Sequence, residues 1–302
     1  MLRTLSTSPT IPTVHAPAVT VRGLQVRYGD VAAVRGIDLD VRRGEILALL
    51  GPNGAGKTST IEVLEGFRAA SGGSIAVLDA DPWAAPRAWR DRIGIVLQSN
   101  SLDPYLTVRE SLDLYAGYFR APLPTADVVG LIGLEEKADE RTSRLSGGQQ
   151  RRLDVGMALV GDPELLFLDE PTTGFDPSAR RQAWDVIAGL RDLGKTVFLT
   201  THYMDEAQRL ADRVTIIAAG QIVARGTPRD LGERESAETT IRYRSGGEEI
   251  VVRTGTPVQT LHELTAAALA SGEELEGLEV TRPSLEDVYL ELTAEPTDGS
   301  AG

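Results

Sequence analysis

The sequence predicts an α/β fold, and three observations support this prediction. Apolar runs typical of buried strands, such as residues 45–50 and 165–168, alternate with helical segments along the chain. A glycine-rich loop follows the first run and leads directly into a helix. An Asp-Glu pair closes the second run, at the carboxyl end of a strand, where open α/β sheets bind their ligands.

Composition and charge limit what else the chain can be. Its 302 residues, 41% of them hydrophobic, can bury one large core and a smaller one. The absence of Cys excludes a disulfide scaffold and a cysteine zinc site. A net charge of −13 argues against a nucleic-acid partner, which needs clustered Lys and Arg, and against adhesion to anionic lipid. No run of about 18 apolar residues exists, so we expect no membrane-spanning segment.

Residues 51–58 read Gly-Pro-Asn-Gly-Ala-Gly-Lys-Thr, an unbroken G-x-x-x-x-G-K-[ST] phosphate-binding pattern. The glycines let successive backbone N–H groups face the β- and γ-phosphates at a helix N-terminus, where the helix dipole favours negative charge. Lys57 adds a positive charge on the phosphates, and the Thr58 hydroxyl is the expected Mg²⁺ ligand. The nucleotide contacts expected from this segment are Gly51, Pro52, Asn53, Gly54, Ala55, Gly56, Lys57, Thr58 and Ser59.

The carboxylates that close the second strand run, Asp169 and Glu170, divide two roles between them. We expect Asp169 to hold the Mg²⁺ shell and Glu170 to orient or deprotonate the attacking water. Such a pair in isolation is more often a solvated turn. The phosphate loop upstream reverses that preference.

Three single residues have a functional and a structural interpretation. Tyr28 offers a ring for stacking on adenine, or is a half-buried strand residue. Gln98 follows a strand run, where its amide can reach Mg²⁺ and the next subdomain, or is a surface glutamine. His202 follows another strand run and can contact the γ-phosphate, or is a core histidine with satisfied hydrogen bonds. The two arginine pairs, at residues 151–152 and 180–181, are expected to be solvated on helix surfaces.

A second anion site is expected where Ser146-Gly147-Gly148 leads into Gln149. A small hydroxyl and bare backbone lie there at another helix N-terminus, which Ser146 also caps. Two anion sites on different subdomains suit one nucleotide bridging two copies of the chain.

These segments, in this order, resemble one family, the ATP-binding cassette (ABC) ATPases, over about residues 19–231. The matching positions are Tyr28 (the adenine aromatic), residues 51–58 (Walker A), Gln98 (Q-loop), residues 145–149 (the LSGGQ signature), residues 165–170 (Walker B), Phe175 and Asp176 (D-loop) and His202 (switch histidine). The resemblance implies a head-to-tail dimer that binds ATP and Mg²⁺. It implies Glu170 and His202 as catalytic residues and Thr58, Gln98 and Asp169 as Mg²⁺ ligands. The ATP contacts implied from the opposite subunit are Ser146, Gly147, Gly148, Gln149 and Asp176.

The resemblance also implies the domain organisation. We expect an ABC ATPase domain at residues 19–232, an α/β P-loop NTPase core with an antiparallel β-subdomain at the nucleotide edge and a helical signature subdomain at about 100–155. Residues 236–293 contain a hairpin pattern, a helix beginning at Pro257 and a last strand and helix, and we expect a small C-terminal α+β appendage packed on the core. Residues 1–18 and 294–302 are expected to be flexible tails, the first of them not a signal peptide.

The ending at residues 283–290 resembles the drug-export branch of the family, the daunorubicin-exporter type. This implies the ATP-hydrolysing subunit of an exporter for a hydrophobic, drug-like compound, peripheral at the cytoplasmic face of the membrane. Its partners would be a second copy of itself and a separate integral membrane permease, whose helices dock in the groove near Gln98. The alternative is a soluble, non-transport ABC ATPase of translation or DNA repair. Those proteins carry two cassettes, coiled-coil insertions or zinc cysteines, and this chain has one cassette and neither extra feature.

Overall fold

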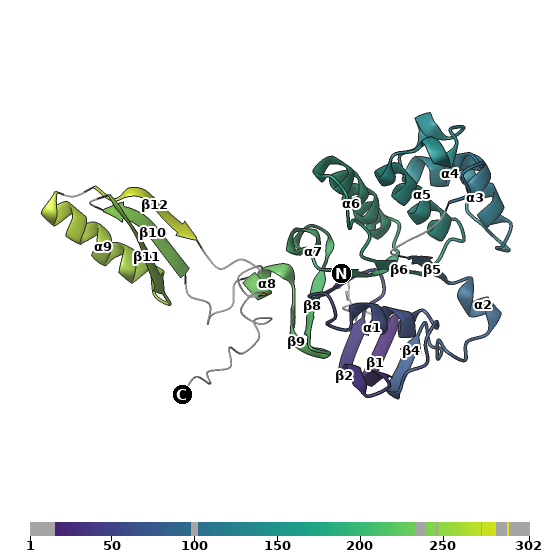
Figure 1. Ribbon diagram of the computed structural model, residues 1–302, viewed down its shortest axis with the longest axis horizontal. Coiled ribbons are helices and arrows are strands. Elements are labelled where there is room, and N and C mark those ends of the chain that lie inside the picture. Colours follow the sequence, from purple (N-terminus) through teal and green to yellow (C-terminus); the bar gives the residue numbers. More distant parts are fainter. Residues whose placement is uncertain are drawn as a thin grey trace, which may run out of the picture.

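The computed structural model describes residues 16–97, 102–232, 239–245, 247–272, 274–281 and 289. A six-stranded sheet forms the centre of the larger domain (Figure 1). Its strands, in spatial order, are β5 (Ile93–Val96), β6 (Leu165–Asp169), β7 (Thr196–Thr201), β3 (Ile46–Leu50), β8 (Arg213–Ala218) and β9 (Gln221–Gly226). The first five run parallel, and β9 pairs antiparallel with β8 at one edge. The α/β fold predicted from the sequence is therefore confirmed, with a mostly parallel central sheet.

Strands β3, β6 and β7 are buried along their whole length because both faces of the sheet are covered. All five residues of β3 are buried, and alternate ones belong to different cores. Leu47 and Leu49 join one core cluster, whereas Ile46, Ala48 and Leu50 join the other. Strands that are buried on both faces lose the polar alternation of a half-exposed strand, and so read as continuous apolar runs.

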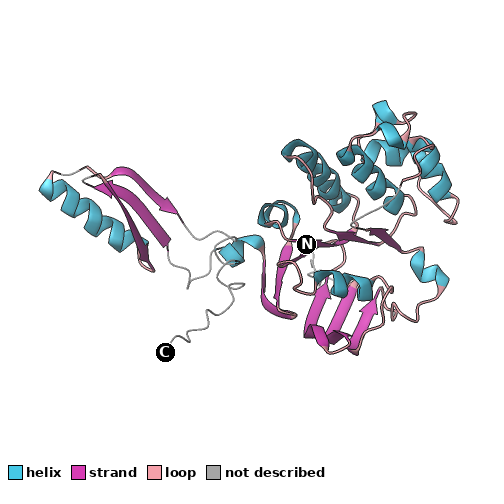
Figure 2. Ribbon diagram, viewed as in Figure 1, coloured by secondary structure: helices cyan, strands magenta, loops and turns pink. Residues whose placement is uncertain are grey.

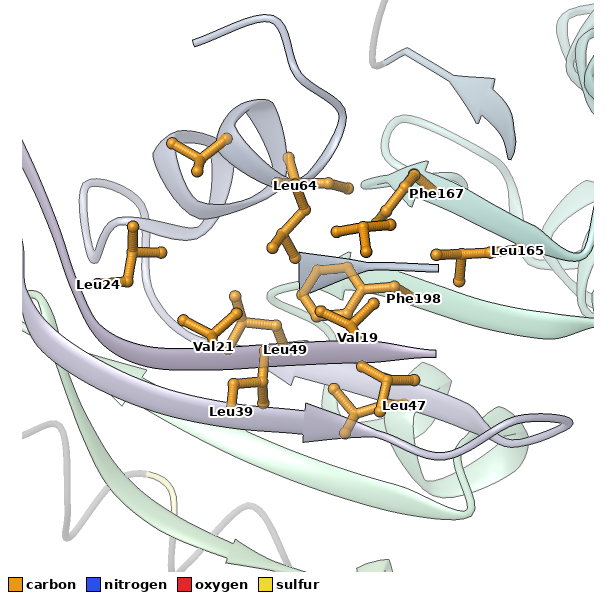
Figure 3. Close-up of a cluster of buried hydrophobic side chains, with 14 of the residues drawn as sticks. Val19, Val21, Leu24, Leu39, Leu47, Leu49, Leu64, Leu165, Phe167 and Phe198 are labelled. Carbon is orange, nitrogen blue, oxygen red and sulfur yellow. The ribbon is translucent and has the colours of Figure 1, made fainter. Parts of the chain in front are cut away.

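The helices that cover the sheet lie on two sides of it (Figure 1). They are α1 (Lys57–Leu64) on one side and α5 (Gly147–Leu159), α6 (Pro177–Asp192) and α7 (Met204–Leu210) on the other. The first core cluster forms where α1 and a second sheet pack on β3, β6 and β7, around Leu64, Phe167 and Phe198 (Figure 3).

The second sheet is antiparallel, as expected at the nucleotide edge, and contains β2 (Val31–Val41), β1 (Val19–Tyr28) and β4 (Gly72–Val77) in that order (Figure 2). It extends beyond the segment of residues 19–41 identified from the sequence, because β4 joins the other edge of β1. The chain reverses between β1 and β2 at Gly29, whose positive φ of 58° favours glycine.

A helical subdomain lies above the β5 edge of the large sheet, with a core cluster of its own (Figure 1). It contains α3 (Val108–Ala116), α4 (Thr125–Leu131) and α5, with short 3₁₀ turns at Glu135–Lys137 and Thr142–Arg144. Thr107 and Glu110 cap α3 with reciprocal side-chain to backbone bonds. The short helix α2 (Arg87–Arg90) lies outside this group, between β4 and β5.

The carboxyl-terminal region begins after α8 (Pro228–Gly232) and forms a small α+β unit, as expected. Its elements are β10 (Thr239–Ser245), β11 (Glu248–Thr254), α9 (Pro257–Ser271) and β12 (Glu276–Thr281), with β10 in the middle of the sheet. Contrary to the expected packing on the core, these elements stand apart from the six-stranded sheet (Figure 1). Tyr289, however, is buried in the second core cluster of the larger domain. The helix expected at residues 284–290, apart from Tyr289, and the tails, apart from residues 16–18, lie outside the described residues.

Among the described residues, no helix is both long enough and apolar enough to cross a membrane.

Candidate nucleotide-binding site

The phosphate loop connects β3 to α1 and can be built only with glycine at its turning points. Gly54 and Gly56 have φ values of 80° and 104°, which side chains rarely adopt. A Cβ atom on Gly56 would lie 2.6 Å from the Ala33 carbonyl oxygen, and one on Gly51 would lie 2.4 Å from that of Ile217. The loop is thus wedged between β2 and β8, with α1 starting directly at Lys57.

A cavity of about 600 Å³ opens over this loop. Its lining residues are Ala33, Asn53, Gly54, Gly56, Lys57, Thr58, Ser59, Glu170, Thr173 and His202. They come from β2, from the loop and the start of α1, from the segment after β6 and from the end of β7, so the fold brings together four segments that are distant in sequence. Gly51, Pro52 and Ala55 belong to the same loop, but the side of the loop that lines the cavity is formed by the other residues.

Lys57 is buried at the base of this cavity. Its Nζ donates to the carbonyl oxygens of Gly51 at 2.9 Å and Pro52 at 3.1 Å, so the loop curls around its own lysine. The same Nζ lies 3.2 Å from Glu170 Oε1, which makes a buried ion pair. A triphosphate fits this arrangement because it supplies anionic oxygens for Lys57 at the N-terminus of a helix.

Glu170 extends from the end of β6 in a left-handed backbone conformation, with φ of 44°. Such a conformation costs about 1–3 kcal/mol in a residue other than glycine. The Glu170 N–H donates to the carbonyl oxygen and to Oγ1 of Thr200, at 3.2 and 3.0 Å, which holds this turn in place. Thr173 Oγ1 donates to Glu170 Oε2 at 3.2 Å. Burial raises the pKa of Glu170, but Lys57 and His202 together bring it below the ordinary value, so the group stays ionised.

His202 flanks the same carboxylate from the end of β7. Its Nδ1 is buried 3.3 Å from Glu170 Oε2, with no well-aligned hydrogen bond to any described residue. The side chain is 27% exposed and lines the cavity, which distinguishes it from the satisfied core histidine considered as the alternative. The imidazole also packs against the Tyr203 ring, with 4.0 Å between the ring centroids.

Asp169 lies behind the cavity lining rather than in it. Thr200 Oγ1 donates to Asp169 Oδ1, and the carboxylate is buried. Burial raises the pKa of Asp169 and Glu170 adds to the rise, while the Thr200 hydrogen bond and Lys57 oppose it. No cluster of three His, Asp or Glu side chains that could hold a metal occurs in the described part of the chain. The oxygens available here, the Thr58 hydroxyl in the cavity lining and the Asp169 carboxylate behind it, fit Mg²⁺, which binds through one or two protein oxygens and the substrate phosphates.

Tyr28, at the end of β1, contacts helix α1 and is not among the residues that line the cavity. Its hydroxyl lies 3.1 Å from Ser59 Oγ, within hydrogen-bonding distance. The Arg68 guanidinium lies over the ring at 4.4 Å, and Arg68 is in turn held by Glu62 at 2.7 Å. The ring is therefore braced on α1, next to the phosphate loop.

The signature residues do not line the cavity of their own chain. Ser146 caps α5, where its Oγ accepts from the Gln149 N–H at 3.3 Å and its own N–H donates to Gln149 Oε1 at 2.9 Å. Gly147 and Gly148 form the first helical positions, and a Cβ on Gly148 would lie 2.8 Å from Ala179 Cβ. Asp176 caps α6 by accepting from the N–H groups of residues 178 and 179, which lower its pKa.

The expectation that the arginine pairs are solvated is wrong for Arg151. This side chain is only 7% exposed and donates to the carbonyl oxygens of Leu97, Asp169 and Pro171. It is buried because α5 passes over the carboxyl ends of β5 and β6. Nothing in the local sequence distinguishes the buried Arg151 from the neighbouring Arg152. Only a prediction of how α5 packs on the sheet could have identified Arg151 as buried. Gln98, the expected Q-loop residue, lies outside the described residues.

Comparison with known proteins agrees with this geometry. A family model described as ABC transporter matches residues 34–173. The chain is 39% identical to the Nod factor export ATP-binding protein I of Ralstonia nicotianae, over 92% of this chain and 94% of that protein. It is 36% identical to a daunorubicin resistance ATP-binding protein of Streptomyces coeruleorubidus, over 92% of this chain and 96% of that protein.

Among solved structures, the chain is similar to cbiO1 from Clostridium perfringens, which is part of the ABC transporter complex cbiONQ. The TM-score is 0.65 at 29% sequence identity, over 73% of this chain and 92% of that chain. Since the phosphate loop, the carboxylates of β6 and the signature helix occur together on this fold, the chain belongs to the ATP-binding proteins of ABC transporters, ATPases whose hydrolysis of ATP is coupled to transport.

Proposed function

We propose that this chain is the ATP-binding and hydrolysing subunit of an ABC exporter of the daunorubicin-exporter type. The observation that carries the proposal is the cluster of Lys57, Glu170 and His202 around one cavity, on a chain whose full-length relatives are named as export and drug-resistance ATP-binding proteins. The cargo is an organic, drug-like compound. It is handled by the permease, because the motifs of this chain are accounted for by nucleotide chemistry.

Within this site, Lys57 and the loop N–H groups hold the phosphates, and Tyr28 stacks on the adenine. Thr58, Asp169 and Gln98 hold Mg²⁺, which when bound neutralises charge on the phosphate oxygens. Glu170, kept ionised beside Lys57, orients the attacking water or takes its proton, and His202 contacts the γ-phosphate. A carboxylate fixed by three side chains needs little reorganisation for this role.

The working unit is a head-to-tail dimer. Ser146, Gly147, Gly148 and Gln149 stand at a helix N-terminus away from their own cavity, so a nucleotide can meet them only on a second copy. Asp176 lies nearby, because α6 packs on α5 at Gly148 and Ala179. One chain carries both halves of the site, which supports a homodimer.

The permease binds a second cavity, of about 440 Å³, between α1, β5 and the helical subdomain. Leu97, the residue before Gln98, lines it, as do the aromatic side chains of Phe67, Tyr115 and Phe119. Docking there places the subunit at the cytoplasmic face of the membrane as a peripheral protein.

The test is to extract the tagged protein from its native membranes in mild detergent and to identify by mass spectrometry what co-purifies. We expect a multi-spanning protein that lacks a phosphate loop of its own. Ribosomal proteins, repair proteins or no partner at all would contradict the exporter proposal and favour the non-transport alternative.

A further inference from the structure

Glu65 is a buried carboxyl group that the nucleotide chemistry does not use. It directly follows α1, and its side chain is only 5% exposed. Oε1 is buried and has no hydrogen-bond partner among the described residues. Buried carboxylates are nearly always paired, because an unpaired one loses its hydration without replacement. Such a group therefore needs an explanation.

The Glu65 side chain lines the same 440 Å³ cavity that the proposed function assigns to the permease. Around it the cavity presents Phe67, Leu97 and Tyr115, which are large apolar side chains left partly exposed. The cavity thus combines an apolar rim with a carboxyl group in its wall. A ligand that fits both features has apolar side chains and at least one group that donates hydrogen bonds.

The other charged groups that line this cavity leave Glu65 without a cation. Asp154, from α5, lies 3.6 Å from the buried Arg151, whose guanidinium is already engaged by backbone carbonyls. Arg90, from α2, is exposed and forms no ion pair with any described residue, Glu65 included. Burial is the main cause that raises the pKa of Glu65 to about 8, and the nearby carboxylates of Asp169 and Glu62 add to it. The local field therefore attracts positive charge.

We propose that Glu65 receives a Lys or Arg side chain from a cytoplasmic helix of the permease, whose apolar residues cover Phe67, Leu97 and Tyr115. The proposal rests on the proposed function, because it assumes that a permease helix occupies this cavity. A basic side chain fits better than a neutral donor, since a cation beside Glu65 favours the ionised carboxylate in an acidic surrounding and donates to Oε1. The proton that the carboxyl group holds in the isolated subunit is then released.

The position of Glu65 also connects the docking cavity with the nucleotide site. The helix α1 begins at Lys57, in the phosphate loop, and Glu65 follows its last residue. Eight residues of α-helix span roughly 12 Å. A permease cation at one end and the nucleotide phosphates at the other would thus bind to the two ends of one rigid element.

The experiment compares how well the permease is retained by wild type, by Glu65→Gln and by a matched control, Glu136→Gln, in the detergent purification described above. Glu136 is an exposed carboxylate of the helical subdomain outside the cavity. We expect the control to retain as much permease as wild type, and Glu65→Gln to retain at least about tenfold less, as when one member of a buried charge pair is removed. ATP affinity and basal hydrolysis of the isolated subunit should be unchanged in both variants, which shows that they fold.

A charge exchange then tests whether the side chain that contacts Glu65 is positively charged. Glu65→Lys should lose the permease, and a Glu placed at one Lys or Arg of the permease helix should restore it in that background. Equal retention by wild type and Glu65→Gln would overturn the proposal while leaving the proposed function intact. Failure of every charge exchange to restore binding would overturn the proposal that the partner side chain is Lys or Arg. If wild type itself retains no multi-spanning protein, the proposed function is wrong, and so is the proposal that Glu65 binds a permease side chain.

Discussion

At the scale of single residues, the chemistry that we propose for this ATPase centres on one contact. The charged atoms of Lys57 and Glu170 lie 3.2 Å apart, and His202 flanks the carboxylate at 3.3 Å. Glu170 reaches this place only through a left-handed backbone conformation, which Thr200 stabilises. Strain that is held by surrounding bonds is typical of catalytic positions.

Glu170→Gln keeps the shape of the side chain but removes its charge. We expect ATP to bind with unchanged affinity and to trap a dimer, while turnover falls by about a hundredfold or more, because water positioning is lost. Phosphate release, nucleotide titration and size-exclusion chromatography measure these effects. The control is Glu164→Gln, an ion-paired carboxylate at the other end of β6. Hydrolysis within about tenfold of wild type would contradict the role of Glu170.

Lys57→Ala should act on binding instead. It removes the charged donor at the base of the cavity, and we expect the dissociation constant for ATP to rise on the order of tenfold to a hundredfold. Lys195→Ala is the matched control, since Lys195 pairs with Asp162 outside the cavity. An unchanged dissociation constant in Lys57→Ala, measured by equilibrium titration, would rule out the assigned phosphate contact.

The raised pKa of Glu65 makes a prediction for the isolated subunit. The pKa is about 8 in the folded chain, against an ordinary 4.5, so between these values the folded state holds an extra proton and stability falls as pH rises. Over this window we expect the unfolding free energy of wild type to fall by up to about 5 kcal/mol more than that of Glu65→Gln. Denaturant unfolding at several pH values measures this, and parallel pH profiles would refute it.

At the scale of elements, Arg151 connects α5 to the large sheet. Its guanidinium donates to carbonyl groups at the ends of β5 and β6 and just beyond β6, so the signature helix is attached beside Asp169 and Glu170. In the proposed head-to-tail dimer, this attachment would fix the helix N-terminus that meets the second subunit. Leu97, which follows β5, is also one of these acceptors and lines the cavity that we propose for permease docking.

Arg151→Met should keep the packing of the aliphatic stem but leave buried carbonyls unpaired. We expect the unfolding free energy to fall by about 2–4 kcal/mol, because each buried unsatisfied group costs about 1–3 kcal/mol. Arg181→Met, on the exposed side of α6, should change it by less than about 0.5 kcal/mol. Denaturant titrations of both variants measure these free energies. Equal losses in the two variants would mean that Arg151 stabilises the fold no more than a surface arginine does.

At the scale of the whole molecule, the carboxyl-terminal unit stands apart, yet the chain returns to the larger domain at Tyr289 (Figure 1). The ring is buried among residues of the second core cluster, and its burial raises the pKa of the phenol. The small unit is thus bounded on both sides by segments that belong to the larger domain, α8 before it and Tyr289 after it.

Tyr289→Ala should therefore destabilise the larger domain, although the residue lies far from it in sequence. We expect a loss of about 3 kcal/mol in the unfolding free energy, as for other buried aromatic side chains. Tyr105→Ala, at an exposed position, is the control. A thermal unfolding transition of the larger domain that is the same in Tyr289→Ala and wild type would contradict the packing of this residue.

Much of the site could be predicted because its signals are local. The phosphate loop is contiguous, and its glycines are required by close approaches such as that of Gly56 to Ala33. The caps Thr107 and Ser146 act within three residues of themselves, so a short pattern contains the whole interaction. The hairpin of β10 and β11 was predictable for the same reason.

The remaining residues could not be predicted, because their surroundings come from distant parts of the chain. Thr200 was absent from the expected site, although across the β6–β7 pairing it donates to the Asp169 carboxylate and accepts from the Glu170 backbone N–H. Arg151 looks like a surface residue until α5 is packed on the sheet.

The groups that carry the chemistry are therefore readable from the sequence alone: a phosphate loop, a carboxylate pair and the signature segment, each formed by a few consecutive residues. The packing of the folded chain establishes which of these groups meet. Glu170 pairs with both Lys57 and His202, the signature residues do not line the cavity of their own chain, and Glu65 Oε1, beside a second cavity, has no hydrogen-bond partner among the described residues. The physical reason is that burial and charge pairing depend on the packing of distant elements, which no local pattern records.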